Sequence, residues 1–352
     1  MKTDDYFQEM RRISKLVQPE LERSIKDIES RIRRDPSSET GLKLVRKRLK
    51  KPKLRDLLTY VSYMAVNPNN DPQQISKACA SMELLNCSTY AFNWILDQKQ
   101  QVESNEDINN LIVFGNLLRE RSQELLSEYG RLDLVKGIGE ISRDIYEAQH
   151  LDSFILTYEN IHNLVPLEKF EKFYNERVEK ITGSFYGLCS FVGASIGEDK
   201  KRNDKSKEIL RRFGIMLGTA GQIMNDLGDF VLVTEDKVSV EKSYKDQFSD
   251  IRQARLTLPA MYTILYGNDE EKNAVLSLMG STNLYFSKMA QCQDAIISSG
   301  AKDYVLNKTK RYRRQIKELL HKLPPSYWRD ILSMSTMHIY TNKYTHGMVK
   351  NV

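Results

Sequence analysis

Apolar residues recur at helical spacing along almost the whole chain. Between Tyr6 and Ile32 they fall every three or four residues, with charged residues between them, which is the pattern of an amphipathic helix. Residues that interrupt helices are scarce, with 9 Pro and 17 Gly among 352 residues, so long unbroken helices are expected. Because 40% of the residues are hydrophobic, the chain can also fill a large core. The sequence therefore predicts an all-α fold.

The same spacing continues to the C-terminal region, with short polar breaks between the predicted helices. The predicted helices after the first are 57–65, 75–96, 108–129, 134–160, 167–197, 206–233, 255–266, 271–299 and 303–346. No segment shows the alternation of a β-strand. No linker is long enough to separate two domains, so residues 1–352 are expected to form a single helical domain.

Net charge and the spacing of the cysteines limit which partners and which compartment fit the sequence. A net charge of +6 suits an anionic small molecule as well as nucleic acid. The basic run at residues 43–55 has no interleaved aromatic residues, so no nucleic-acid partner is expected. The four cysteines lack metal-ligand spacing, which fits a reduced, cytoplasmic protein. No apolar stretch is long enough for a membrane span, and no signal peptide is recognisable at the N-terminus.

One predicted helix carries polar residues where apolar ones are expected. In residues 221–230, Gln222, Asp226 and Asp229 fall on one helical face, and Asn225 lies beside them. The flanking sequence is strongly apolar, which argues against an ordinary solvated face. Two carboxylates in apolar surroundings repel each other unless a cation lies between them. Oxygen ligands of this kind suit Mg²⁺, which binds through one or two carboxylates and substrate phosphates.

A second polar stripe lies in the predicted helix 75–96 and just beyond it. Asn86, Tyr90, Asn93 and Asp97 share one helical face. A buried asparagine whose hydrogen bonds are satisfied by a neighbour is the commoner explanation of such a stripe. The pattern alone therefore does not decide whether this stripe is a functional site or a part of the core whose hydrogen bonds are satisfied.

Five segments occur in an order that resembles the trans-isoprenyl diphosphate synthases. That family carries two aspartate-rich motifs of DDxxD type on facing helices. The matching segments here are KPKLRDLL at 51–58, EAQHLD at 147–152, Lys180-Ile181-Thr182, the NDLGD sequence at 225–229, and DIRQARLTLP at 250–259. Together they extend the resemblance over roughly residues 40–330.

The resemblance implies a helical bundle of the isoprenoid synthase type around a central apolar cavity. It also implies Mg²⁺, an allylic prenyl diphosphate substrate and a homodimer. The metal ligands that it implies are Asp97, Asn225, Asp226 and Asp229. The contacts to the substrate diphosphate that it implies are Arg55, Lys180, Gln222 and Arg255. The residues expected to drive departure of the diphosphate are Asp226, Asp229, Lys180 and Arg255.

Four residues near the first motif are expected to line the prenyl pocket: Ser88, Thr89, Asn93 and Trp94. Small residues at 88 and 89 indicate a long pocket, although bulky neighbours argue the other way. Trp94 stands where the family has a metal-binding aspartate. Its ring either steadies a carbocation through its π face or fills the volume of a lost metal ion, and both interpretations stay open.

The departures from the family pattern fall on the side that holds isopentenyl diphosphate. The first motif is reduced to Asn93 and Asp97, and the Arg-Arg-Gly that follows it in the family is absent. Asn86 replaces a histidine, and Pro52 replaces a lysine. These changes remove charge-assisted hydrogen bonds worth about 1.5–3 kcal/mol each. Ordinary chain elongation is therefore not the first expectation.

Three hypotheses follow. The leading one is a Mg²⁺-dependent enzyme that ionises an allylic prenyl diphosphate for terpene cyclisation or for transfer to a non-standard acceptor. The second is chain elongation by a prenyltransferase with an altered acceptor site, in which Lys51, Lys53 or Lys99 holds isopentenyl diphosphate. The third is a non-catalytic regulatory subunit of a prenyl synthase.

Overall fold

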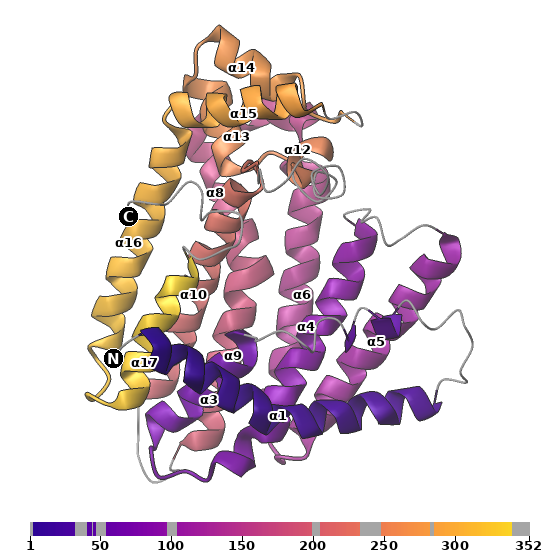
Figure 1. The fold of residues 1–352 in the computed structure, drawn as a ribbon, viewed down its shortest axis with the longest axis vertical. Helices are drawn as coiled ribbons and strands as arrows, with labels where there is room; N and C mark the ends of the chain where they lie inside the picture. The colour runs from indigo at the N-terminus through magenta and orange to yellow at the C-terminus, as the bar shows by residue number, and fades with distance from the viewer. Residues whose placement is uncertain are drawn as a thin grey trace. The chain divides into compact units, whose positions relative to one another are not determined.

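Helices make up most of the described chain (Figure 1). The computed structural model describes residues 3–31, 41–43, 45–46, 54–96, 104–198, 205–232, 248–281 and 285–339. The α-helices are α1 (Thr3–Arg31), α3 (Leu54–Val66), α4 (Ser76–Leu96), α5 (Asn105–Ser127), α6 (Leu132–His150), α7 (Ile161–Leu164), α8 (Leu167–Val178), α9 (Ser184–Gly197), α10 (Ser206–Gly228), α12 (Ser249–Arg252), α13 (Leu258–Tyr266), α14 (Asp269–Leu276), α15 (Phe286–Ser298), α16 (Ala301–Leu320) and α17 (Tyr327–Ser335). Within the described ranges, β-type pairing is limited to an isolated bridge between Thr157 and Arg255. The prediction of an all-α fold is confirmed.

Three of the predicted helices are broken in the structure. The predicted helix 134–160 is interrupted at Leu156 and Thr157, and Thr157 is extended, with a ψ of 157°. The predicted helix 271–299 forms α14 and α15, and Gly280, which has a φ of 69°, lies between them. The predicted helix 303–346 forms α16 and α17. Pro324 and Pro325 lie between these two, and proline cannot continue a helix because it lacks a backbone N–H. The part of this prediction beyond residue 339 falls outside the described residues.

Two wide, π-helical turns extend or join helices. The first, η3 (Leu151–Ile155), follows α6, and the second, η5 (Glu179–Gly183), joins α8 to α9. The N–H of Leu156 donates to the carbonyl oxygen of Leu151 at 2.8 Å, a spacing one residue longer than in an α-helix. Such turns are rare and often mark functional sites. Asp152 lies in the first of these turns, and Lys180 lies in the second.

The chain divides into two compact units. Unit 1 comprises Met1–Glu140, Tyr186–Gly214 and Leu319–Ser335, and unit 2 comprises Ile141–Phe185, Ile215–Glu318 and Thr336–Val352. Helices α6, α9, α10 and α16 carry residues of both units. The prediction of a single domain over residues 1–352 stays a prediction.

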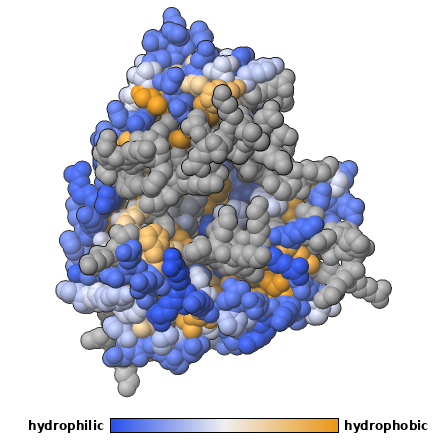
Figure 2. Space-filling view, in the orientation of Figure 1, coloured by the Kyte–Doolittle hydropathy of each residue, from blue (hydrophilic) through white to orange (hydrophobic). Residues whose placement is uncertain are grey.

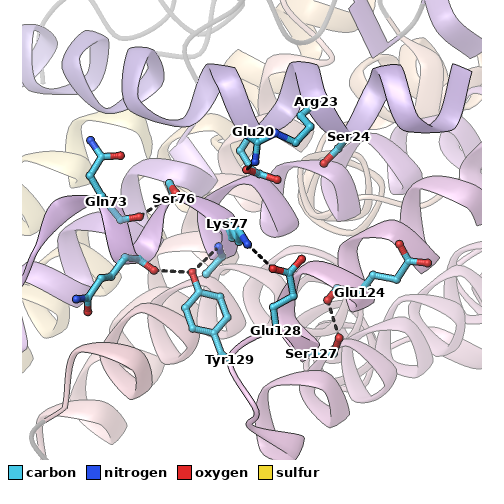
Figure 3. Close-up of polar contacts among 12 residues, drawn as sticks. Glu20, Arg23, Ser24, Gln73, Ser76, Lys77, Glu124, Ser127, Glu128 and Tyr129 are labelled. Carbon is cyan, nitrogen blue, oxygen red and sulfur yellow. Dashed lines mark hydrogen bonds and ion pairs between the residues drawn. The ribbon is translucent and has the colours of Figure 1, made fainter. Parts of the chain in front are cut away.

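Unit 1 is built around the packing of α4 against α5. Helix α1 lies across α3 and α4, and α17 packs on α3 (Figure 1). The hydroxyl of Tyr129, just beyond α5, donates to the carbonyl oxygen of Gln74 at 2.7 Å and accepts from the N–H of Ala78 at 3.1 Å. Figure 3 shows Lys77 of α4 turned toward Glu128, with which it forms an ion pair. These polar contacts tie the end of α5 to the start of α4.

Helices α3 and α9 approach each other closely enough to require glycine. A Cβ atom on Gly193 would lie 1.9 Å from the carbonyl oxygen of Thr59, so a larger residue cannot occupy this position without a shift of the backbone. The close approach also brings Arg55 of α3 over the ring of Tyr186, with 5.1 Å between the guanidinium carbon and the ring centroid.

In unit 2, α13 packs against α8, α14 and α15. Helix α8 is also in contact with η3 and η5, so the segment that carries the predicted Lys180 lies next to the end of α6. On α8, Glu171 accepts a hydrogen bond from the hydroxyl of Tyr304 at 2.9 Å and one from Lys308 at 3.0 Å. This contact ties α16 to α8.

Among the residues coloured by hydropathy in Figure 2, most on the face drawn are hydrophilic, and hydrophobic ones show in small areas among them. Exposed large hydrophobic side chains include those of Val113 and Leu132. Among the described helices, none combines the length and the apolar character that crossing a membrane requires.

Candidate functional site

Among the described residues, several buried charged groups lie together in unit 2, around Arg177. We define the Arg177 cluster as Asp152, Tyr174, Arg177, Gln222 and Asp226. The guanidinium of Arg177 contacts Asp226 at 2.7 Å through Nη1, and it contacts Asp152 at 2.7 Å through Nε and at 3.2 Å through Nη2. The hydroxyl of Tyr174 and the amide nitrogen of Gln222 each donate to Asp226 at 2.8 Å. The cluster joins η3, α8 and α10.

The charged members of this cluster are almost completely removed from water. The side chains of Arg177 and Asp152 are each 5% exposed, and that of Asp226 is 0% exposed. Burial raises the pKa of the Asp226 carboxyl. Arg177, Gln222 and Tyr174 lower this pKa, but they offset the effect of burial only in part. Burial acts to lower the pKa of Arg177, but Asp152 and Asp226 outweigh it and the net direction is upward. The guanidinium therefore stays charged inside the protein.

Asp229 lies just after the end of α10, where its carboxylate serves the start of α12. One carboxylate oxygen accepts from the backbone N–H of Ser249 at 3.1 Å and from its hydroxyl at 3.2 Å. The other accepts from the backbone N–H of Asp250 at 3.0 Å. Unpaired N–H groups at a helix start favour an acidic acceptor. Both oxygens of Asp229 therefore accept hydrogen bonds from the start of α12.

A further buried carboxyl, Asp250, lies close to these groups. Burial raises the pKa of Asp250 well above its ordinary value, and Asp229 and Asp226 raise it further, while Arg177 and Arg255 act in the opposite direction. Arg255 forms an ion pair with Asp250 at 3.7 Å, and the two side chains are 12% and 14% exposed. The predicted diphosphate contact Arg255 thus has an acidic partner within its own segment.

Two further predicted diphosphate contacts are Gln222, a member of the Arg177 cluster, and Lys180, which lies in η5 directly after α8. Lys180 donates to Glu147 at 2.7 Å and to Glu176 at 2.6 Å, and these hydrogen bonds raise its pKa. Gln222 donates to Asp226 and accepts from the hydroxyl of Thr182 at 2.8 Å. Lys180 is 27% exposed and its two partners are more exposed. A bound anion can therefore compete for Lys180 from the solvent side.

The first-motif stripe, which consists of Asn86, Tyr90, Asn93 and Asp97, belongs to unit 1. Asn86 and Glu83 are fully buried, and the amide nitrogen of Asn86 donates to Glu83 at 3.0 Å. The hydroxyl of Thr89 donates to the carbonyl oxygen of Asn86 at 2.8 Å, and Ser88 is 2% exposed. The Oδ1 of Asn86 is buried and has no hydrogen-bond partner among the described residues. This part of the stripe is therefore only partly satisfied as a hydrogen-bonded core, and both alternatives that the sequence leaves stay open.

The last turn of α4 carries the remaining predicted pocket residues. Asn93 and Trp94 are both half-buried. Phe92 beside them packs close to Gly115 of α5. Asp97 lies outside the described residues, as do Lys51, Lys53 and Lys99. The assignments of Ser88, Thr89, Asn93 and Trp94 to a prenyl pocket, and of Asp97 to a metal, stay predictions.

Arg55 is the predicted diphosphate contact in unit 1. It is half-buried and lies over the ring of Tyr186, an arrangement that attracts a cation to an aromatic face. Burial acts to lower the pKa of Arg55, but Tyr186, Tyr90 and Glu83 outweigh it and the net direction is upward. Arg55 is therefore a fixed positive charge, and its contact with a diphosphate stays a prediction.

The residues of the second motif that were predicted to bind Mg²⁺ are Asn225, Asp226 and Asp229. Among the described residues, no group of three or more histidine, cysteine, aspartate or glutamate side chains is placed to hold a metal. Asp226 is enclosed and ion-paired, and Asp229 accepts hydrogen bonds from two backbone N–H groups. Asn225 is exposed. The described residues do not fit a magnesium site in this arrangement, so the metal assignments stay predictions drawn from the resemblance.

Sequence reasoning did not single out Arg177 or Tyr174. Phe170, Tyr174 and Val178 are all buried and form one face of α8. Arg177 lies three residues after Tyr174 and seven after Phe170, so it belongs to that same face. A charged residue on an apolar face was the signal that could have found it.

The structure is similar to solved structures of polyprenyl and geranylgeranyl diphosphate synthases. A geranylgeranyl pyrophosphate synthetase from Pyrococcus horikoshii superposes with a TM-score of 0.75 at 20% identity, over 97% of this chain and 100% of that one. A polyprenyl synthase from Caulobacter crescentus, complexed with calcium and isoprenyl diphosphate, superposes with a TM-score of 0.72 at 20% identity, over 94% and 97% of the two chains. The fold is therefore that of the isoprenyl synthases, as predicted.

The chain belongs to the polyprenyl synthetase family, whose model matches residues 50–296. A geranylgeranyl diphosphate synthase from Sulfolobus acidocaldarius is 23% identical over 256 residues, which are 70% of this chain and 73% of that protein. The predicted family and the predicted enzyme class, an isoprenoid synthase, are confirmed. The central cavity, the facing of the two motif helices, the homodimer and the cytoplasmic location stay predictions.

Proposed function

We propose that this protein is a prenyltransferase that extends an allylic prenyl diphosphate. The observation that carries the proposal is the Arg177 cluster, which lies inside the segment that the family model matches. Burying three charged groups together is costly, and such groups concentrate at functional sites. The cluster includes Asp226 of the second aspartate motif, which in the resemblance lies on the side of the allylic substrate.

Chain elongation, the second hypothesis, has better support than cyclisation or non-standard transfer. The relatives and similar structures are named as synthases of geranylgeranyl and polyprenyl diphosphates. The departures near the first motif then mean that the acceptor is held by other groups. Those that the sequence offers are Lys51, Lys53 and Lys99.

In this proposal Lys180 contacts the diphosphate of the allylic substrate. Its ion pairs with Glu147 and Glu176 lie at the surface, and surface pairs contribute little to stability. Exchanging one carboxylate for a diphosphate oxygen therefore costs little, and the diphosphate gains a charge-assisted hydrogen bond. Positive charge placed where negative charge builds up on the leaving group lowers the barrier to cleavage of the C–O bond.

The test is incorporation of labelled isopentenyl diphosphate by the pure protein, supplied with C5 to C20 allylic diphosphates and Mg²⁺. A longer prenyl diphosphate, identified by mass spectrometry, is the expected product. Release of pyrophosphate with a hydrocarbon or an alcohol, and without incorporation, would instead favour cyclisation. No turnover alone, but a changed product when mixed with an active synthase, would favour the regulatory subunit.

Lys180→Ala is the diagnostic variant for this assay, and Lys207→Ala is its control. Lys207 also pairs with a glutamate, Glu198, at 3.2 Å at the surface, but it lies outside the site segments. Loss of turnover in the first variant alone supports the assignment of Lys180. Equal turnover in both variants contradicts it.

A further inference from the structure

We infer that Arg177 is a built-in counter-ion for Asp226 and Asp152, and that Asp226 positions the second aspartate motif rather than ligating a metal. The inference rests on the proposed function only for the identity of the site. It assigns a role to Arg177, which lies outside every segment that carries the family resemblance.

The hydrogen bonding of Asp226 leaves little room for a metal. One carboxylate oxygen accepts from both Arg177 and Tyr174, and the other accepts from Gln222. An ionised carboxylate offers about four acceptor positions, so three of them are occupied by protein donors. The side chain is 0% exposed. A divalent ion that keeps several of its waters cannot reach it without breaking these contacts.

Arg177 supplies the charge that a cation would otherwise bring. Its planar guanidinium makes two contacts to Asp152 and one to Asp226, and this forked geometry is what makes arginine suited to buried carboxylates. The two aspartates come from η3 and α10, while Arg177 comes from α8. One side chain therefore compensates carboxylates from two other elements.

The consequence is a fixed orientation of α10 where the motif lies. Gln222, one turn before Asp226, donates to Asp226 with its amide nitrogen and accepts from Thr182 with its oxygen. Asn225, which precedes Asp226, is exposed. The pairing with Arg177 thus holds Asp226 inward and leaves Asn225 as the member of the motif that faces solvent. Asp226 acts on the substrate through this placement of its neighbours.

The inference is tested by separating metal binding from substrate binding. Mn²⁺ binding is followed by electron paramagnetic resonance with and without inorganic pyrophosphate. Binding of farnesyl thiolodiphosphate, an unreactive analogue, is followed by calorimetry at 15 °C. Both are measured for the wild type, for Asp226→Asn and for Glu171→Gln. Glu171 is the matched control because it also holds α8 to another helix of unit 2, through Tyr304 and Lys308.

We expect Asp226→Asn to keep its Mn²⁺ affinity within about twofold and to lose about tenfold in analogue affinity, as expected when a positioning contact is lost. Glu171→Gln should keep both. A tenfold loss of Mn²⁺ affinity in Asp226→Asn would overturn the inference, because it would make Asp226 a ligand. Unchanged analogue affinity would overturn the positioning role.

Arg177→Lys is the second variant, in case Asp226→Asn does not fold. It keeps the positive charge but not the forked geometry, so it too should keep Mn²⁺ affinity and lose analogue affinity, and the reverse result would overturn the inference. If the wild type binds no analogue, the proposed function and the positioning role both fail. The counter-ion role is then decided by melting temperature, which should fall in Asp226→Asn by at least about 5 °C more than in Glu171→Gln.

Discussion

The two motif regions of this protein differ in how their buried polar groups are paired. In unit 2, the second motif carries full charges, and Arg177 pairs with Asp152 and Asp226 away from water. In unit 1, the described part of the first-motif stripe carries neutral groups, apart from Glu83, and Asn86 and Thr89 are engaged in short-range hydrogen bonds. The second region is organised by ion pairs. The first combines amide and hydroxyl contacts with the buried carboxylate of Glu83, which also helps to raise the pKa of Arg55.

This difference indicates where the chemistry of the family has been retained. A buried ion pair is expensive to build and is weak evidence for stability alone, so its presence favours a functional reason. Asn86 has a satisfied donor but an Oδ1 without a hydrogen-bond partner among the described residues, and it carries no charge that would have to be compensated. Under the proposed function, these ion pairs favour unit 2 as the better-preserved part of the site.

The largest effect is expected from Arg177→Met. This change leaves Asp152 and Asp226 buried without their shared cation, which should lower the free energy of unfolding by about 3–5 kcal/mol. Urea denaturation followed by circular dichroism measures it. A loss below about 1 kcal/mol would mean that the two carboxylates do not depend on Arg177.

Lys180→Ala should have the next largest effect, on rate rather than on stability. Removing one preorganised charge from a developing anion typically costs roughly 10²–10³ in kcat. Stability should hardly change, because the ion pairs of Lys180 lie at the surface. Steady-state kinetics together with a melting curve separate the two effects, and a variant with normal kcat would remove Lys180 from the site.

Asn86→Ala probes the neutral region. It removes a hydrogen bond to the buried Glu83, which should cost about 1–3 kcal/mol of stability. Because this contact is a core contact in our account, kcat should fall less than in Lys180→Ala. A loss of activity with unchanged stability would show that the first region is also part of the catalytic site.

The pH dependence of stability should reveal the surplus of acid near the second motif. The pKa of Asp250 is raised well above its ordinary value by burial and by its acidic neighbours. A carboxyl whose pKa is raised by folding stabilises the protein at pH below its unfolded pKa, and this stability is lost as the pH rises through the folded pKa. Asp250→Asn should therefore stabilise the protein at pH 7, and the gain should be smaller at pH 5 than at pH 8. Unfolding midpoints at pH 5 and pH 8 test this, and a destabilised variant at pH 8 would contradict it.

The smallest effect is expected at the surface pair of Lys77 and Glu128 (Figure 3). These side chains are 41% and 43% exposed, and pairs of this kind contribute about 0.2–1 kcal/mol. Lys77→Ala should therefore lower stability by less than about 1 kcal/mol, and the loss should shrink in high salt. A larger loss would mean that α4 and α5 depend on this contact.

Much of the helical content follows from the sequence, because burial of one face imposes a regular spacing of apolar residues. The breaks at Gly280 and at Pro324–Pro325 were visible as residue types, but the apolar pattern continued across them. The π-helical turns at Asp152 and Lys180 were not predictable, because a one-residue insertion into a helix leaves no clear change in composition.

The candidate site was predicted in part. The spacing of Gln222 and Asp226 placed them correctly on one face of α10, where they share a hydrogen bond. The pattern could not show that Asp229 turns to the start of α12, since that depends on a segment twenty residues later. Nor could it pair Asp226 with Arg177, because the two lie 49 residues apart.

The central claim is that Asp226 and Arg177 form one compensated interior pair, and a double-mutant cycle tests it most directly. The free energy of unfolding is measured for the wild type, for Asp226→Asn, for Arg177→Met and for the double variant. We predict a coupling energy of about 1–3 kcal/mol, as found for residues in one buried network. Losses that add to within about 0.5 kcal/mol would contradict the claim.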